Sequence, residues 1–382
     1  DETYQSYLKE MDTQYVATML EEMYTDDAVD ILNDLDNKER ESYLEMMDSE
    51  TADEINELLS YAEYTAGAIM TTEYVSILES STVRSAMAVM RKEAPTAETI
   101  YYIFVVNDEH QLTGVMSLRD LIIADEDALI RDIMSERIVS VQLTTDQEEA
   151  AQIMKDYNFL ALPVINEAGV LQGIITVDDI IDVIEEEASD DYSKLAGISD
   201  MDDIKDGPFR SVKNRLPWLI MLLFLGMLTA NLMSRFEQTL DQVALLALFI
   251  PLISGTSGNS GTQALAVAVR GIATGEIGER SKVKLLFREM LTGLIMGIIC
   301  AVIVVGIVFF WKGSLIIGLL VGGAICCSIL VATLAGSFIP LLIYKMGIDP
   351  AVASGPFITT LNDVTSLMIY LGLATIFLNQ IM

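Results

Sequence analysis

The chain has 382 residues, of which 52% are hydrophobic, and yet its formal net charge is −33. The two properties separate along the sequence: residues 1–206 carry 49 acidic and 12 basic residues, a net charge of −37, whereas residues 207–382 carry 7 and 11, a net charge of +4. This pattern excludes an entirely soluble protein and argues against a nucleic acid as partner, because an acidic soluble half is joined to a membrane half.

Residues 1–64 are predicted to form an acidic domain of short helices. Ile31, Tyr43 and Ile55 recur with a period of 12 residues, and a second apolar series, Leu35, Met47 and Leu59, follows each of them four residues later on the same helical face. About three short helices would therefore stack into a small superhelix. Because the chain does not start with Met, we expect this domain to be truncated.

Residues 65–183 contain an internal repeat. The segment IMTTEYVSI at 69–77 matches IMSERIVSV at 133–141, and YIFVVNDEHQLTGVMSLRDLI at 102–122 matches LALPVINEAGVLQGIITVDDII at 160–181. Each copy is predicted to form a strand, a helix, a strand, a hairpin turn, a strand and a helix. The repeat resembles a tandem pair of α/β CBS domains, at 65–127 and 128–183.

The resemblance to CBS domains implies an adenine nucleotide, such as ATP, as a ligand. In that family a Ser/Thr-x-x-Asp sequence at the last strand-to-helix turn holds the ribose, and its matches are Ser117–Asp120 and Thr176–Asp179. The alternative is that these residues only cap helices. The first copy is favoured, because Arg119 adds a guanidinium suited to phosphate and Tyr102 could stack on a base.

An acidic helix, at about residues 178–196 and ending at Gly197, and a connecting segment, 184–215, lead into five predicted membrane spans. The second and fourth spans are interrupted by Gly or Pro. Basic residues cluster before span 1, between spans 2 and 3, and between spans 4 and 5, so we expect the acidic half to be cytosolic and the C-terminus outside. The spans are 216–234, 243–270, 285–311, 314–344 and 350–380.

Three segments in this order, DDIIDVIEEEASDDYSKL, PLISGTSGNSGTQALAVAVRG and DPAVASGPFITTLNDVTSLMIY, make the whole chain similar to the MgtE family of magnesium channels. The resemblance implies a multidomain plasma-membrane protein with a helical N domain, a CBS pair, a plug helix and a pore domain of five helices at 216–382. It also implies a homodimer in the lipid bilayer, with a pore lined by spans 2 and 5 and closed by the plug helix when cytosolic Mg²⁺ is high.

Asp363 is the central candidate in the pore, because a carboxylate within a membrane span is costly and requires a function. Two copies facing each other across a dimer axis would suit a hydrated Mg²⁺, which sheds its water reluctantly. Gly355 departs from the Asn that some family members have, so a side-chain contact is lost there. The other predicted pore residues are Thr359, Thr360, Asn362, Gly258, Asn259 and Gln263.

A second set of Mg²⁺ ligands, outside the membrane, follows from the resemblance. Asp349 stands where it can face the plug helix, and Asp27 is the expected ligand from the first domain. Asn158 occupies a position where an acidic ligand is expected. The remaining predicted ligands, from the second CBS copy and the acidic helix, are Asp146, Glu148, Asp179, Asp182, Glu187, Asp190 and Asp191.

Two other function classes stay open. A channel or transporter for another dication, such as Mn²⁺ or Co²⁺, would have the same architecture. A membrane receptor that senses adenine nucleotide without transport would leave Asp363 unexplained. An enzyme is not expected, because the sequence shows no nucleophile with its base and no Gly-rich phosphate loop.

Overall fold

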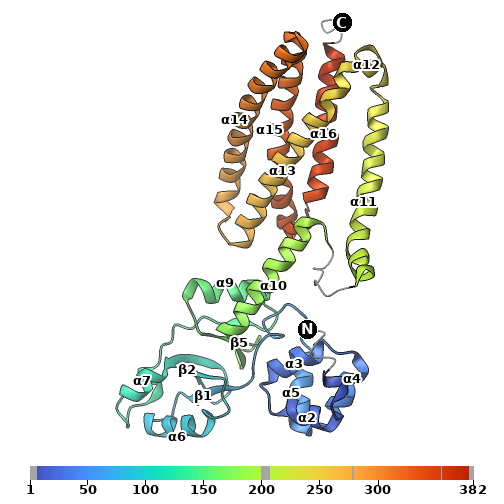
Figure 1. The fold of residues 1–382 in the computed structure, drawn as a ribbon. Helices are drawn as coiled ribbons and strands as arrows, with labels where there is room; N and C mark the ends of the chain where they lie inside the picture. The colour runs from blue at the N-terminus through green and yellow to red at the C-terminus, as the bar shows by residue number, and fades with distance from the viewer. Residues whose placement is uncertain (1–6, 199–206, 278, 354, 378–382) are drawn as a thin grey trace. The chain divides into compact units, whose positions relative to one another are not determined.

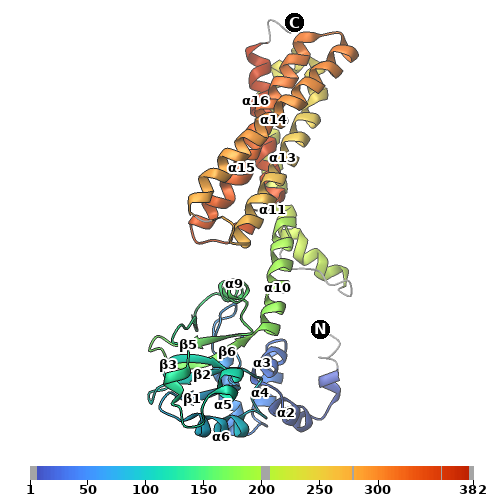
Figure 2. The same ribbon diagram turned by 90° about the vertical axis from the view of Figure 1, so that its left-hand side faces the viewer.

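The computed structural model describes residues 7–198, 207–277, 279–353 and 355–377, which form two compact units with their boundary between Glu187 and Ala188. Figure 1 shows the helices of the second unit and Figure 2 shows the strands of the first. Each unit has its own apolar core, and each is described by itself.

After the helical residues 7–10, the described part of the N domain contains four helices, where the sequence indicated about three: α2 (Thr13–Glu21), α3 (Thr25–Asn33), α4 (Asn37–Leu44) and α5 (Ser49–Leu59). Asp12, Asp36 and Asp48 cap α2, α4 and α5 by accepting hydrogen bonds from backbone N–H groups of the first turn. Of the residues with the period of 12, four are buried in the core and two, Ile31 and Leu59, pack against it; the buried ones are Leu35, Tyr43, Met47 and Ile55. The apolar periodicity therefore packs these short helices together.

Two copies of one α/β pattern follow, as predicted. In each copy a short first strand pairs in parallel with the second, which pairs antiparallel with the third, giving two three-stranded sheets. The first copy contains β1 (Tyr74–Leu78), α6 (Val83–Glu93), β2 (Thr99–Val106), β3 (Leu112–Ser117) and α7 (Leu118–Ile123). After the short α8 (Ile130–Ile133), the second contains β4 (Val141–Gln142), α9 (Gln147–Tyr157), β5 (Ala161–Ile165), β6 (Leu171–Thr176) and α10 (Val177–Ala196).

The two copies pack on each other through their strands. Phe104 and Val106 of β2 share a buried cluster with Ala161 of β5 and with Leu171 and Ile174 of β6. This contact places the turns that end β3 and β6 at fixed positions in one unit. Helix α10 begins at the second of these turns and continues for 20 residues, across the boundary into the second unit.

The second unit is a helical bundle (Figure 1). Its long helices are α11 (Pro208–Ser234), α13 (Ile250–Ala273), α14 (Glu279–Lys312), α15 (Leu315–Lys345) and α16 (Gly355–Ile376); its short elements are α12 (Glu237–Gln242), η1 (Ala244–Phe249) and η2 (Pro350–Val352). Four helices of the described chain are long and apolar enough to cross a membrane: α11, α14 from Ser281, α15 and α16. Small polar residues make α13 less apolar, although it packs closely against α15 and α16.

The predicted interruption of span 4 is wrong, because α15 is a continuous helix, whereas the predicted span 2 is divided into η1 and α13 next to Pro251. The glycines of α13 and α15 serve close packing instead: a Cβ added at Gly336 of α15 would collide with the backbone carbonyl of Gly261 of α13. Span 5 also differs from expectation. Helix α16 starts at Gly355, so Pro356 lies in its first turn, where the missing N–H costs no helical hydrogen bond.

Candidate cation-binding sites

A polar seam joins α13 and α16 inside the bundle. The hydroxyl of Ser254 donates a hydrogen bond of 2.5 Å to Oδ1 of Asp363, the carboxylate that the sequence singled out. Gly258, one turn further along α13, lies against Thr359: a Cβ added there would be 3.0 Å from Cγ2 of Thr359 and 3.9 Å from Oδ1 of Asp363. The absence of a side chain at Gly258 therefore lets Thr359 of α16 pack closely against the backbone of α13.

Asn362, next to Asp363, is fully buried, and neither its amide nitrogen nor its amide oxygen has a hydrogen-bond partner among the described residues. Its Nδ2 occupies the space that a Cβ at Gly261 would need. A buried amide without partners costs on the order of 1–3 kcal/mol for each unsatisfied group. The seam thus contains a buried amide whose hydrogen-bonding capacity is not used within the described chain.

Of the other predicted pore residues, Thr359 and Thr360 lie on α16, and Asn259 and Gln263 lie on α13. The hydroxyls of Thr359 and Thr360 donate to the carbonyls of Gly355 and Pro356, both at 2.9 Å, in addition to the helical backbone N–H groups that these carbonyls accept. Asn259 is exposed on α13, as is Gln263 one turn later. Ser254 was not among the predicted residues, although its position one helical turn before Gly258 puts both on one face.

A cationic side chain occupies the place where a metal bridge was expected. The ammonium group of Lys194, near the end of α10, pairs with Asp190 and, at 2.5 Å, with Oδ2 of Asp349, which caps η2. Although burial lowers the pKa of Lys194, the hydrogen bonds to Asp190 and Asp349 outweigh it and raise the pKa above its ordinary value. The expected partners, Asp190 and Asp349, therefore share a protein cation.

The close packing between the end of α10 and the start of α16 explains why a glycine occupies position 355. A Cβ there would be 3.0 Å from the backbone carbonyl oxygen of Leu195, so a larger residue would push the end of α10 away from the start of α16. Gly197, which follows α10, has a φ of +72°, as expected for the glycine that ends a helix. The missing Asn side chain at position 355 is thus replaced by close backbone packing.

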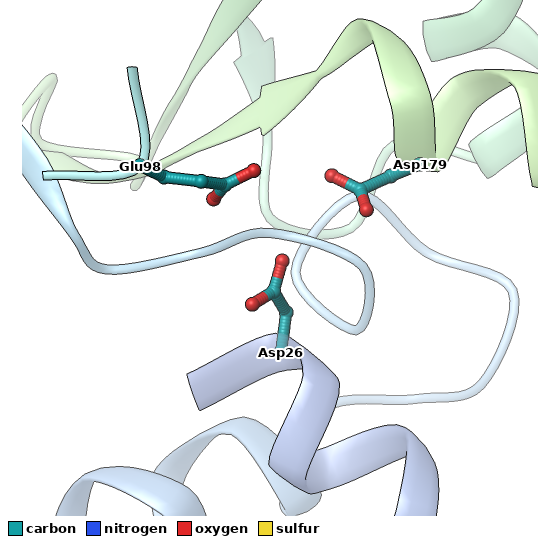
Figure 3. A group of neighbouring side chains, drawn as sticks. All are labelled: Asp26, Glu98 and Asp179. Carbon is teal, nitrogen blue, oxygen red and sulfur yellow. The ribbon is translucent and has the colours of Figure 1, made fainter. Parts of the chain in front are cut away.

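A cluster of three carboxylates lies in the first unit (Figure 3). Asp26 comes from the first turn of α3, Glu98 precedes β2, and Asp179 comes from the first turn of α10; one oxygen of each lies within 4.8 Å of the others. Oδ1 of Asp26 and Oε2 of Glu98 are buried without a partner among the described residues, while Oδ2 of Asp179 accepts from the hydroxyl of Thr176 at 2.5 Å. This geometry suits a divalent cation.

Burial and mutual repulsion raise the pKa values of this cluster. Burial, with the negative charges of Glu98 and Asp179, raises the pKa of Asp26 to about 8. Burial and the charge of Asp179 raise the pKa of Glu98 to about 7, and burial likewise raises that of Asp179. Burial and the charge of Asp179 bring the pKa of neighbouring Asp30 to about 6. The carboxylates are therefore under-compensated at neutral pH.

Of the predicted regulatory ligands, Asp179 belongs to the cluster. Asp27 is exposed on α3, and its neighbour Asp26 points inward instead. The sequence did not identify Asp26 and Glu98 as ligands, because Asp26 is one of two adjacent acidic residues and Glu98 belongs to no motif. The other predicted ligands in this region do not belong to the cluster of Asp26, Glu98 and Asp179. Asp146 caps α9, and Glu187 accepts a hydrogen bond from Gln147 at 2.8 Å. Glu148 and Asp182 are exposed, and Asp191 is half-buried.

A pocket of about 460 Å³ lies at the turn that ends β3. Ser117 and Arg119 line it as predicted, but the tyrosine is Tyr101, whereas Tyr102 is half-buried between the two CBS copies. Ser117 and Asp120 form a capping box in which the hydroxyl donates to the carboxylate at 2.7 Å. The pocket combines a guanidinium with an exposed aromatic ring, a pair suited to phosphate and base.

Comparisons with known proteins match each part of the chain. Residues 250–373 match the family model described as a divalent cation transporter, residues 1–64 match the MgtE intracellular N domain, and residues 66–127 and 130–186 match the CBS domain. The chain is 53% identical over 330 residues to the magnesium transporter MgtE of Enterococcus faecalis, covering 86% of this chain and 73% of the relative. It is 39% identical over 362 residues to the magnesium transporter MgtE of Bacillus subtilis, covering 95% and 80%.

Two solved structures are each similar to about half of the chain. One, described as the soluble part of a magnesium transporter, is 56% identical and covers 49% of this chain and 73% of its own, with a TM-score of 0.48. Another, the cytosolic domain of the Mg²⁺ channel MgtE in complex with ATP, is 43% identical and covers 48% and 75%, with a TM-score of 0.46.

Proposed function

The chain belongs to the MgtE family of divalent cation transporters, and from this premise we propose that it is a Mg²⁺ channel that imports Mg²⁺ and is closed by cytosolic Mg²⁺. The observation that carries the proposal is the carboxylate of Asp363 in the polar seam between α13 and α16, held by Ser254. A carboxylate inside a membrane bundle is costly, and it is stabilised when a cation lies beside it.

The ligands of the seam favour a hydrated ion. Asp363 offers one carboxylate per chain, and the hydroxyl of Ser254 lies beside it. Mg²⁺ usually keeps several waters and binds through one or two carboxylates, so it suits this donor set better than a fully dehydrated cage would. Mn²⁺ and Co²⁺ accept similar ligands, and the transport assay has to separate them from Mg²⁺.

A homodimer would complete the pathway. Asn259 and Gln263 form an exposed polar stripe on α13, which would be unfavourable against lipid. In a two-chain pore this stripe would face water and the partner chain, and two copies of Asp363 would share one ion. The proposal places the acidic half in the cytosol, because the segments before span 1, between spans 2 and 3, and between spans 4 and 5 carry most of the basic residues of the membrane half.

Transport by the purified chain in proteoliposomes tests the channel. We expect wild-type chain to take up Mg²⁺, Asp363→Ala to abolish uptake, and Asp363→Asn to leave weak uptake, because the amide keeps the size but loses the charge. Asp241→Asn is the matched control, since Asp241 is exposed on α12 outside the seam. Wild-type uptake by Asp363→Ala, or faster uptake of Mn²⁺ or Co²⁺ than of Mg²⁺, would overturn the proposal.

Closure by Mg²⁺ is proposed to act through α10. Its first turn contributes Asp179 to the carboxylate cluster, and its last turns contribute Asp190 and Lys194 beside Asp349. Binding of Mg²⁺ at the first end would compensate the repulsion there and order the helix. An ordered α10 would hold the start of α16, the helix that carries Asp363, and so bias the pore towards its closed state.

The pocket at Ser117 and Arg119 is proposed to hold an adenine nucleotide. Arg119 would bind phosphate, and Tyr101 would stack on the base. Calorimetry of the full chain with ATP, ADP and AMP, repeated with Arg119→Gln, tests this: loss of heat in the variant supports the pocket, and no heat with wild type rejects it.

A further inference from the structure

A polar pocket lies in the second unit, separate from the polar seam that contains Asp363. It has a volume of about 500 Å³ and lies between the end of α13 and the start of α14. Arg270 enters it from α13, and Lys284 and Arg288 enter it from α14, where they are one helical turn apart. The proposed ion pathway does not use these three cations, and a concave site with converging polar groups is a typical ligand site.

The charges of the pocket are not balanced. Arg288 pairs with Glu289, whose Oε1 lies 3.0 Å from Nη2 and whose side chain is buried. Arg270 and Lys284 are exposed and make no ion pair with any residue that the structure describes. One more carboxylate, Glu276, lines the pocket. Among the side chains that the structure describes, three cations therefore face two carboxylates, which leaves a surplus of one positive charge for an anion.

The surface beside the pocket is suited to lipid. From Lys284 and Arg288 the same face of α14 continues at helical spacing to Leu291, Ile295 and Val302, which are 47%, 50% and 67% exposed. This face belongs to the helix with the highest mean hydropathy of the candidate spans, 3.0. The basic pocket thus lies at the end of an exposed apolar stripe, as it would for a molecule with an anionic head and an apolar tail.

We propose that this pocket binds the phosphate of an anionic phospholipid, such as phosphatidylglycerol, whose acyl chain lies along the stripe on α14. The phosphodiester carries one negative charge, which matches the surplus positive charge. Its oxygens would accept hydrogen bonds from Arg270 and Lys284, and the apolar stripe distinguishes a lipid from free phosphate. Because α13 also carries the seam residues, an occupied pocket would fix the end of that helix.

Native mass spectrometry of the purified full chain tests the site. The chain is released from nanodiscs that contain equal amounts of phosphatidylglycerol and phosphatidylcholine with the same acyl chains, and the retained lipids are counted. We expect wild type to retain phosphatidylglycerol preferentially, and Arg270→Gln with Lys284→Gln to reduce that preference by about tenfold, since each basic residue contributes to attraction of anionic lipid.

The controls separate the site from net charge and from free phosphate. Lys213→Gln with Lys345→Gln removes the same charge from exposed positions outside the pocket and should keep the preference. Arg270→Lys with Lys284→Arg should also keep it. An equal loss in the Lys213 and Lys345 control, or no loss in the pocket variant, would overturn the proposal. So would full displacement of the lipid by millimolar inorganic phosphate, which would identify free phosphate as the ligand.

Discussion

Helix α10 brings carboxylates from distant segments together near both of its ends, and the two groups differ in what neutralises them. Near the start, Asp179 meets Asp26 and Glu98, and no basic side chain of the described chain pairs with them. Near the end, Lys194 lies between Asp190 and Asp349. The first group needs protons or a metal ion for compensation, whereas the second contains its own cation.

This difference has consequences for sensing. A carboxylate group without a built-in cation changes its free energy strongly when Mg²⁺ binds, because each ion relieves several repulsions at once. A group that already contains an ammonium gains less, since Mg²⁺ must compete with Lys194. We therefore expect the start of α10 to respond to Mg²⁺ and the end to provide a contact that persists without it.

The largest expected effect is a dependence of Mg²⁺ binding on pH at the start of α10. With the pKa of Asp26 at about 8 and that of Glu98 at about 7, Mg²⁺ must displace protons below neutral pH. We expect the affinity to fall on the order of a hundredfold between about pH 8 and about pH 6. Isothermal titration of residues 1–187 in two buffers of different ionisation enthalpy would measure both the affinity and the protons released.

The same pKa values determine whether the free energy of unfolding rises or falls with pH when no divalent cation is present. An unfolded Asp has a pKa of about 4, so between about pH 4 and about pH 8 the folded chain keeps a proton at Asp26 that the unfolded chain releases. The free energy of unfolding of residues 1–187 should therefore fall as pH rises through this window, and Mg²⁺ should restore it. Stability that rises with pH in a chelating buffer would contradict the cluster.

A smaller effect is expected from single carboxylates in the two CBS copies. Asp120 and Asp179 occupy the same position in the repeat, but Asp120 makes a capping box with Ser117 and has no carboxylate cluster around it. Asp26→Asn, which removes a ligand beside Asp179, should weaken Mg²⁺ binding about tenfold. Asp120→Asn should change it by less than about twofold, as a surface charge does. Equal effects in the same titration would remove the distinction between the copies.

The sequence predicted the folds well where a pattern repeats. The period of 12 gave the short helices, and the repeat of strands, helix and turn gave the two sheets, because both patterns record burial. The interruption predicted in α15 was wrong, and the glycines of α13 do not break that helix, since glycine in a membrane bundle can serve close packing as well as a break. Composition alone does not separate these two uses.

The candidate sites were harder to predict because they depend on rotation and on distant contacts. Asp26 and Asp27 are adjacent, and the roughly 100° rotation per residue in α3 decides which one points inward. Glu98 lies outside any motif and joins Asp179 only when the two copies and the N domain have packed. Lys194 is a single cation in an acidic helix, and its pairing with Asp349 spans 155 residues.

The smallest expected effect tests the end of α10. Lys194→Gln leaves Asp190 and Asp349 facing each other without the ammonium, so the contact between α10 and the start of α16 should come to require Mg²⁺. The three side chains are between 34% and 45% exposed, and partly exposed ion pairs contribute about 1 kcal/mol or less. We therefore expect the Mg²⁺ concentration that half-closes the channel to rise by about fivefold at most.

Flux into oriented proteoliposomes with internal Mg²⁺ titrated measures this shift. Lys194→Arg should restore the wild-type midpoint because it keeps the charge, and Lys345→Gln, which removes an exposed lysine at the end of α15, should not move it. A midpoint that stays at the wild-type value in Lys194→Gln would mean that the ammonium does not stabilise the closed state. The end of α10 would then resemble its start, where carboxylates depend on the metal ion alone, and the comparison between the two ends would no longer hold.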